Sequence, residues 1–174
     1  MALRFEQLIE RHHDEIFAYL WRLMGKDGRR DGATDVEDIV QDVFLRAYES
    51  FSGLRPNSNH RAWLYKIATN CAYSQLRRMK HRRDKLLSLE HSATDQETGT
   101  EVSSLHKQVE QTVHNLVSRL PAKQKACVTL RYLQDLDYPE IAQVLSCSQE
   151  SARANVYQAI HRLRIALEKN HDNT

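Results

Sequence analysis

The chain has 174 residues, of which 41% are hydrophobic and 28% charged, and its formal net charge is +2. These proportions are typical of a folded protein with one medium or two small domains, and they exclude an intrinsically disordered chain. No apolar run approaches the ~18 residues that a membrane span needs, and the N-terminus lacks the apolar core of a signal peptide.

Apolar residues at helical spacing predict a first helix over about 5–24, which a Gly-containing loop over 25–32 ends. A second helix is predicted to begin at Thr34, because Thr34 and Glu37 form the Thr-x-x-Glu pattern of a capping box. The exposed face of its first half is strongly acidic. Carboxylates repel the phosphates of DNA, so this face is either solvated surface or a dock for a basic or polar protein partner.

A loop rich in Ser, Asn, Gly and Pro over 51–60 leads to a third predicted helix over about 61–81. Between residues 77 and 85, six Lys or Arg residues are opposed by a single acidic one, and the same helix carries Trp63 and Tyr65. Rings that stack on unpaired bases, beside cations that follow phosphates, are typical of single-stranded nucleic-acid binding. The alternatives are a solvated charge run and aromatic residues that belong to the core, which the spacing favours for Trp63.

Residues 88–104 differ from both flanks in composition. They contain several Ser and Thr and four acidic residues but no Lys or Arg, and their few apolar residues lack periodicity. This composition predicts a flexible acidic linker. It divides the chain into an N-terminal domain over 1–87 and a C-terminal domain over 105–174.

In the C-terminal domain, helical spacing predicts one helix over about 105–120 and a further helix after Pro121. A short helix over 138–145 and a longer one over 149–167 follow, joined by the polar turn Ser146-Cys147-Ser148. A short helix, a tight turn and a longer helix with a polar outer face form a helix-turn-helix pattern. Such a unit usually places its second helix in the DNA major groove.

Capping residues support both of these helices. Asp137 and Glu140 form a capping box before the shorter helix, and Ser148 is positioned to cap the longer one. Arg, Asn and Gln on the outer face of the longer helix suit guanine edges, adenine edges and phosphates. A solvated face is the more common explanation for a lone helix, but the preceding capped helix and turn favour DNA binding. The side chains on this face are Gln149, Glu150, Arg153, Asn155, Gln158, His161 and Arg162.

The sequence shows no pattern of a catalytic, cofactor or metal site. Cys71, Cys127 and Cys147 are widely spaced and odd in number, which indicates neither a disulfide framework nor a zinc site and suggests a reducing cytoplasm. The histidines form no metal-ligand pattern, and no Gly-rich phosphate-binding loop is present. We therefore expect no enzymatic activity, no metal and no cofactor in this chain.

Two segments resemble regions of bacterial sigma factors. The run from Asp35 to Tyr48, followed by Arg61-Ala-Trp-Leu-Tyr-Lys-Ile-Ala-Thr-Asn70, resembles region 2. The run from Leu120 to Tyr132, with the helix-turn-helix after it, resembles region 4. The whole chain is similar to the small extracytoplasmic-function (ECF) group of the sigma-70 family, which keeps only these two domains and a linker. The resemblance implies an all-α fold of two small helical domains.

The resemblance also implies a division of labour. The acidic helix would dock on the β′ clamp helices of core RNA polymerase. The third helix and the preceding loop would recognise and melt the promoter −10 element and hold a flipped base. The last helix would recognise the −35 element. The linker would thread through the RNA exit channel, and the β flap and a restraining anti-sigma factor would be further partners. The implied polymerase-binding residues are Asp35, Asp38, Gln41, Asp42 and Arg46. The implied −10 residues are Phe51, Asn57, Asn59, His60, Trp63, Tyr65, Asn70, Arg77, Arg78, Arg82 and Arg83. The implied −35 residues are Ser148, Gln149, Glu150, Ser151, Arg153, Asn155, Gln158 and Arg162.

The chain departs from many family members in the helix-turn-helix. Ser146 stands where many members have Gly, which adopts a left-handed turn conformation at little cost. Asn155 and Gln158 stand where many members carry basic residues. The sequence therefore predicts a −35 contact that relies more on hydrogen bonds and on Arg153 and Arg162, with a shallower salt dependence.

Two other functions fit parts of the pattern. A stand-alone helix-turn-helix regulator with an N-terminal helical domain would bind its operator without polymerase, usually as a dimer on a palindrome. A helical protein that binds partners through its acidic helix would need no productive DNA contact. The acidic helix and the basic, aromatic-bearing helix lie together in the N-terminal domain, whereas the helix-turn-helix lies in the C-terminal domain. This favours a sigma factor, because a plain regulator needs neither.

Overall fold

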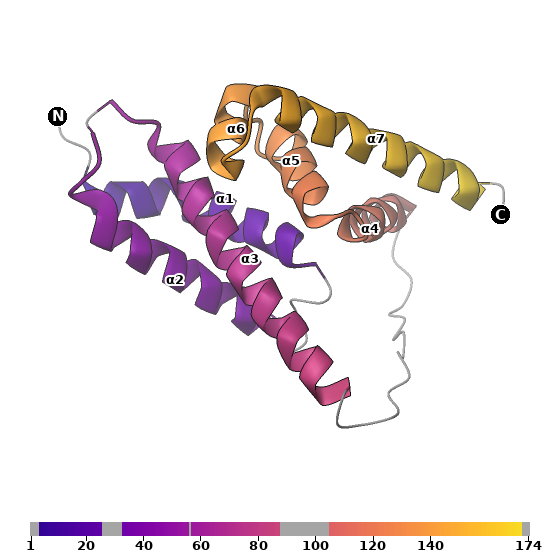
Figure 1. The fold of residues 1–174 in the computed structure, drawn as a ribbon, viewed down its shortest axis with the longest axis horizontal. Coiled ribbons are helices and arrows are strands. Elements are labelled where there is room, and N and C mark those ends of the chain that lie inside the picture. Colours follow the sequence, from indigo (N-terminus) through magenta and orange to yellow (C-terminus); the bar gives the residue numbers. More distant parts are fainter. Residues whose placement is uncertain (1–3, 26–32, 56, 88–104, 172–174) are drawn as a thin grey trace.

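The computed structural model describes residues 4–25, 33–55, 57–87 and 105–171, and its regular structure over these ranges is entirely α-helical. The elements are α1 (Phe5–Met24), α2 (Ala33–Phe51), α3 (His60–Leu87), α4 (Leu105–Ser118), α5 (Ala122–Tyr132), α6 (Tyr138–Leu145) and α7 (Gln149–His171). Figure 1 shows α1, α2 and α3 as one group and α4 to α7 as a second. The predicted all-α fold is confirmed. The predicted linker over 88–104 lies outside the described residues.

Helices α1, α2 and α3 each turn an apolar stripe toward a shared core, as their hydrophobic periodicity predicts. The fully buried side chains of this group include Leu8, Ile16, Tyr19, Leu20, Leu23, Val36, Leu64 and Tyr65. The hydroxyl of Tyr19 lies 2.8 Å from Thr69 Oγ1, and the Thr69 hydroxyl donates to the carbonyl of Tyr65 at 2.7 Å. The buried hydroxyl groups of Tyr19 and Thr69 thus have hydrogen-bond partners within the core.

Several helix boundaries differ from the predicted ones, most of all the end of α3. Helix α2 begins at Ala33, one residue before the predicted cap Thr34. Helix α3 continues to Leu87 rather than ending near residue 81. Its last segment contains no Gly or Pro, and Arg, Lys, Met and Leu all favour the helix, so nothing in the sequence stops it. None of the described helices combines the length and the apolarity that a transmembrane segment requires.

Capping begins both helices of the helix-turn-helix, as predicted. An Asp137 carboxylate oxygen accepts from the backbone N–H of Glu140 at 2.8 Å, and Glu140 Oε2 accepts from the N–H of Asp137 at 2.9 Å. Ser148 Oγ accepts from the N–H of Ser151 at 3.1 Å at the start of α7. These bonds satisfy N–H groups that a helix start leaves without a partner in the helix.

The turn between α6 and α7 depends on a serine in a left-handed conformation. Ser146 has φ 52° and ψ 50°, in the region that glycine usually occupies. The N–H of Cys147 closes the turn by donating to the carbonyl of Ala142 at 3.0 Å. The turn therefore forms with the glycine-type geometry although its sequence lacks the glycine.

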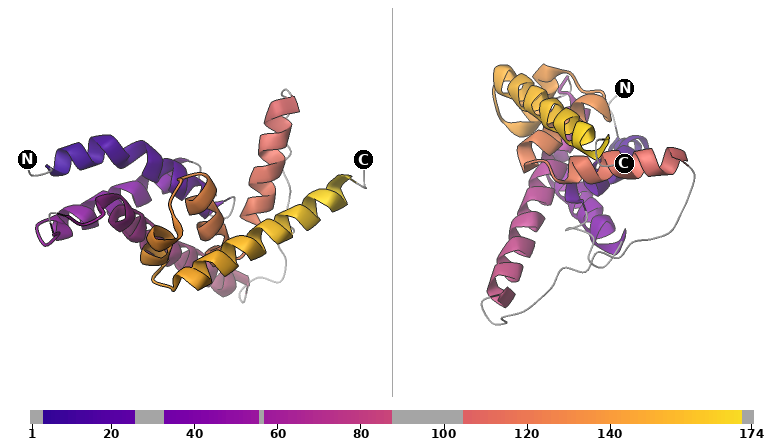
Figure 2. Two further views of the ribbon diagram at one scale, coloured as in Figure 1. Left: turned by 90° about the horizontal axis from the view of Figure 1, so that it is seen from above. Right: turned by 90° about the vertical axis from the view of Figure 1, so that its right-hand side faces the viewer.

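The two helical groups share one hydrophobic core. A continuous cluster of buried side chains includes Leu64 and Ala68 of α3 together with Leu130 of α5 and Ile141 of α6. Helix α3 packs against α6, and α1 packs against α5. Figure 2 shows α4 and α7 diverging beyond this shared region. The start of α3 is thereby held against the helix-turn-helix.

Candidate nucleic-acid interface

A cavity of about 460 Å³ opens where α1 meets the loop before α3. The residues that line it are Leu8, Arg11, His12, Ser58, Asn59, His60 and Arg61. Guanidinium, imidazole and amide groups thus converge on one concave surface. Such groups donate hydrogen bonds to base edges and phosphates. Of these residues, Asn59 and His60 were predicted as −10 contacts, whereas Arg11 and His12 lie on α1 and show no signal of this role in the sequence.

A charged network forms one wall of this cavity. Arg61 binds the Glu15 carboxylate in a forked contact, with Nη2 at 2.8 Å and Nε at 3.1 Å from Oε2, and His12 Nδ1 donates to the other oxygen. Burial alone would raise the pKa of Glu15. The hydrogen bonds from His12 and Arg61 and the charge of Arg61 outweigh it and lower that pKa to about 2. Glu15 is therefore ionised at neutral pH and holds Arg61 in place.

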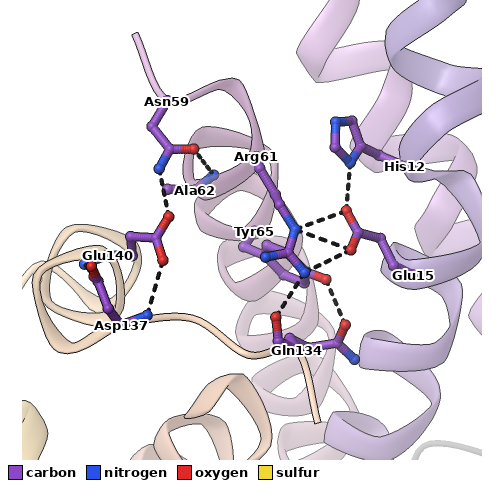
Figure 3. Close-up of polar contacts among 9 residues, drawn as sticks. All are labelled: His12, Glu15, Asn59, Arg61, Ala62, Tyr65, Gln134, Asp137 and Glu140. Carbon is purple, nitrogen blue, oxygen red and sulfur yellow. Dashed lines mark hydrogen bonds and ion pairs between the residues drawn. The ribbon is translucent and has the colours of Figure 1, made fainter. Parts of the chain in front are cut away.

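Side chains near the start of α3 also bind the C-terminal helices, as Figure 3 shows. Asn59 Nδ2 donates to Glu140 Oε1 at 2.7 Å. Arg61 Nη2 donates to the main-chain carbonyl of Gln134 at 2.7 Å, and the Tyr65 hydroxyl donates to Gln134 Oε1 at 2.7 Å. The loop between α5 and α6 is thus attached to the same residues that shape the cavity.

Asn59 joins the starts of two helices. Its Oδ1 accepts from the N–H of Ala62 at 3.0 Å and so caps α3, while its amide N–H binds Glu140 in the capping box of α6. Both ends of one side-chain amide are therefore occupied in this arrangement (Figure 3).

The aromatic residues of the predicted −10 site point into the protein. Tyr65 is fully buried, so this arrangement gives its side chain no access to DNA, contrary to the predicted contact. Burial raises the pKa of its hydroxyl above the usual value, which keeps the hydroxyl a hydrogen-bond donor. Trp63 is half-buried against the core, as its spacing favours. Phe51 belongs to α2 rather than to the loop, and its ring lies 5.3 Å from that of Phe5.

The polar members of the predicted −10 site are more accessible. His60 is half-buried and faces the cavity. The exposed members are Asn57, Asn59, Asn70, Arg77, Arg78, Arg82 and Arg83. Figure 1 shows the end of α3, where the four arginines lie, projecting beyond the other helices. The helix therefore carries these cations on its exposed surface, away from the core.

Helix α2 exposes a mixed acidic and apolar surface. Asp38 and Gln41 are exposed, and Asp42 accepts from Arg46 Nε at 3.0 Å. The side chain of Asp35 lies outside the described residues. Leu45 and Tyr48 on the same helix are 59% and 66% exposed. These two residues were not predicted as contact residues, because an apolar residue on a helix is more often buried. Their position outside the apolar stripe of α2 was the sequence signal that they are exposed.

The predicted −35 residues on α7 fall into two groups. Ser148 and Ser151 form the helix cap, Asn155 donates to the carbonyl of Ser151 at 2.8 Å, and Gln158 accepts from Gln124 of α5 at 2.9 Å. The other group forms none of these bonds and is exposed, as Ser148 and Gln158 also are; its members are Gln149, Glu150, Arg153 and Arg162. Tyr157, which the sequence analysis did not single out, is 74% exposed and stacks with the ring of His161. The outer face of α7 thus presents cations and an aromatic ring pair to solvent.

Comparison with known proteins identifies both helical groups. Residues 8–83 match the family Sigma-70 region 2, and residues 110–163 match the family Sigma-70, region 4. An ECF RNA polymerase sigma-E factor of Haemophilus influenzae is 28% identical over 163 residues, which cover 89% of this chain and 82% of that protein. The ECF RNA polymerase sigma-E factor of Escherichia coli K12 is 31% identical over 133 residues, which cover 72% of this chain and 70% of that protein.

Two solved structures share the fold. The sigma factor RpoE bound to the anti-sigma factor NepR, from Bartonella quintana, superposes with a TM-score of 0.73 at 23% identity, covering 94% of this chain and 96% of that one. CnrH bound to the cytosolic domain of CnrY gives a TM-score of 0.65 at 24% identity, covering 95% of this chain and 88% of that one. With both region matches in order and a relative of 31% identity, the chain belongs to the ECF group of the sigma-70 family of RNA polymerase sigma factors.

Proposed function

We propose that this chain binds core RNA polymerase, recognises the −35 and −10 promoter elements, melts the −10 region and so directs transcription initiation in the cytoplasm. The observation that carries this proposal is the distribution of three different surfaces over one chain. Helix α2 exposes carboxylates beside apolar side chains, the start of α3 borders a polar cavity, and α7 exposes cations on a helix-turn-helix. A stand-alone regulator would need only the last of these.

The polymerase dock is proposed on α2. Asp38, Gln41 and Asp42 supply polar and acidic groups, and the exposed Leu45 and Tyr48 supply apolar area beside them. Exposed apolar side chains rimmed by charges are typical of protein–protein contact sites. We infer that the partner surface is basic with an apolar centre, and the β′ clamp helices of core polymerase are the partner that the family resemblance implies.

The −10 element is proposed to bind at the cavity and along α3. The cavity of about 460 Å³ has room for a single base. His60 and Arg11 can donate hydrogen bonds into it, and the Asn59 amide that binds Glu140 can do so once it releases that carboxylate. Unstacking a base costs a few kcal/mol, and base-edge bonds together with phosphate contacts offset that cost. The four exposed arginines at the end of α3 would follow the phosphates of the displaced strand.

The −35 element is proposed to bind α7, whose exposed Arg153 and Arg162 suit base edges or phosphates. Asn155 and Gln158 already bond within the protein, so their contribution would require those bonds to exchange for bonds to DNA. The β flap of polymerase and an anti-sigma protein are further proposed partners. The complexes of RpoE with NepR and of CnrH with CnrY support the second.

Two measurements test the proposal: the affinity of the chain for core polymerase, and run-off transcription by the assembled holoenzyme. We expect the double variant Asp38→Lys/Asp42→Lys to lose polymerase binding by at least tenfold while the variant keeps its duplex −35 affinity, because charge reversal at a basic partner's contact is strongly unfavourable. Glu10→Lys, an exposed reversal on α1, is the matched control and should bind normally.

Three results would contradict the proposal. If the double variant bound core polymerase like the unmodified chain, α2 would not be the dock. If the unmodified chain bound polymerase yet never produced transcripts from specific start points, or bound an operator tightly without polymerase, the regulator hypothesis would replace the sigma-factor assignment.

A further inference from the structure

A tyrosine at the start of α6 lies against an arginine of α7. The guanidinium carbon of Arg153 is 4.9 Å from the ring centroid of Tyr138, and that of Arg131 is 5.3 Å from the same centroid. Both distances are within the range of cation–π attraction. One ring therefore serves two guanidinium groups, one on α5 and one on the exposed side of the helix-turn-helix.

Tyr138 is a fixed support. It is the first residue of α6, directly after the N-cap Asp137 and within the Asp137–Glu140 capping box, and its half-buried side chain packs against the hydrophobic core. Arg131 is anchored as well, because its Nη1 donates to the carbonyl of Leu136 at 3.1 Å. The ring is therefore attached to a capped helix and lies beside an anchored arginine, without the backbone freedom of a loop.

Arg153 is exposed, and within the described part of the chain it forms no ion pair with a carboxylate, although Glu150 lies one turn away. The choice of a ring over a carboxylate matters for binding DNA. A carboxylate would cancel the positive charge and occupy N–H donors, whereas a ring attracts the guanidinium through its face and leaves the in-plane donors available. The contact also restricts a side chain that otherwise has large rotamer freedom.

We propose that Tyr138 is a positioning residue that presents the Arg153 guanidinium to the −35 element. This inference rests on the proposed role of α7 as the helix that contacts −35 DNA. Tyr138 acts through Arg153: it restricts the guanidinium before binding, so less conformational freedom is lost when the guanidinium meets a guanine edge or a phosphate.

A double-mutant cycle tests the proposal with holoenzyme, the full chain assembled on core polymerase. The variants are Arg153→Ala, Tyr138→Leu, Tyr138→Phe and the double variant Arg153→Ala/Tyr138→Leu, measured for affinity to promoter DNA and to a panel with single base-pair changes in −35. We expect Arg153→Ala to weaken binding roughly tenfold or more. Tyr138→Leu should weaken it about 3–10-fold, and Tyr138→Phe, which keeps the ring, should bind almost normally.

In the Arg153→Ala background, Tyr138→Leu should cause no further loss, and both single variants should lose discrimination at the same base pair. If Arg153→Ala itself left −35 binding unchanged, the proposed function of α7 would fail. If Arg153→Ala weakened binding while Tyr138→Leu had no effect or an additive one, only the positioning role would be overturned.

A second measurement on the free chain is independent of DNA and of the stability of Tyr138→Leu. The proton resonances of the Arg153 side chain should carry an upfield ring-current shift that remains in Tyr138→Phe. Replacing the ring by the non-aromatic Met, in Tyr138→Met, should abolish that shift. Arg153 resonances identical in the Phe and Met variants would contradict the contact.

Discussion

At the scale of single residues, the Glu15 carboxylate is the centre of a network that joins α1, α3 and the loop between α5 and α6. It binds His12 on its own helix and Arg61 on α3, and Arg61 in turn reaches the main chain of Gln134. The sequence did not predict this network, because Glu15 and Arg61 share no local pattern; an acidic residue on an amphipathic helix usually faces solvent.

Replacing Glu15 by Gln should change how stability depends on pH. The folded-state pKa of Glu15 is lowered from 4.5 to about 2, so its contribution to stability is complete above about pH 5 and is lost as the pH falls toward 2. We expect Glu15→Gln to lower the free energy of unfolding at pH 7 by about 1–2 kcal/mol, allowing for solvent screening. The difference from the unmodified chain should shrink toward zero near pH 2.

Urea denaturation at several pH values measures this difference. Asp14→Asn is the matched control, because Asp14 is exposed and its partner among the described residues is the exposed His13. A stability difference for Glu15→Gln that stayed constant between pH 7 and pH 3 would show that the lowered pKa is not its source.

At the scale of secondary-structure elements, capping signals predicted helix starts better than composition predicted helix ends. Asp137, Glu140 and Ser148 cap their helices as the sequence indicates. The end of α3 was misplaced because the segment after His81 contains good helix formers and no stop signal. At Ser146 the local signal was misleading. A serine disfavours the left-handed backbone conformation, but the turn as a whole imposes that conformation.

Ser146→Gly should stabilise the C-terminal helices. A non-glycine residue in the left-handed region costs roughly 1–2 kcal/mol, and glycine's greater freedom in the unfolded chain offsets part of the gain. We expect a net increase of about 0.5–1 kcal/mol in the free energy of unfolding, measured by thermal and urea denaturation. Ser146→Ala is the control, since it keeps the strain; equal stability of the Gly and Ala variants would mean that the turn stores no strain.

At the scale of the whole molecule, the packing of the two helical groups was beyond sequence analysis. The periodicity of each helix predicted which side chains are buried, but it does not say on which partner helix they pack. The contacts between groups join residues far apart in sequence, such as Tyr65 with Gln134 and Tyr73 with the carbonyl of Ala122. These contacts can be known only from the tertiary arrangement. Without that arrangement the sequence predicted a DNA contact for Tyr65, whose side chain is buried between the two helical groups.

Gln134→Ala should loosen the contact between the two helical groups. It leaves the buried Tyr65 hydroxyl without its acceptor, and an unsatisfied buried group costs about 1–3 kcal/mol. We expect the radius of gyration from small-angle X-ray scattering to increase and the amides of the loop between α5 and α6 to exchange faster. The matched control is Tyr65→Phe/Gln134→Leu, which removes both partners and should restore the compact form. An unchanged radius for Gln134→Ala would show that this hydrogen bond does not hold the groups together.

The two hydrogen bonds of Asn59 have a consequence for the order of events at a promoter. Its amide N–H binds Glu140, and its carbonyl oxygen caps α3 (Figure 3). If Asn59 contacts the −10 element as proposed, a nucleobase that took the same N–H would have to displace Glu140 first, so α6 would compete with the melted strand for this group. Occupancy of this single amide would then link the arrangement of the free protein to the moment at which the duplex opens.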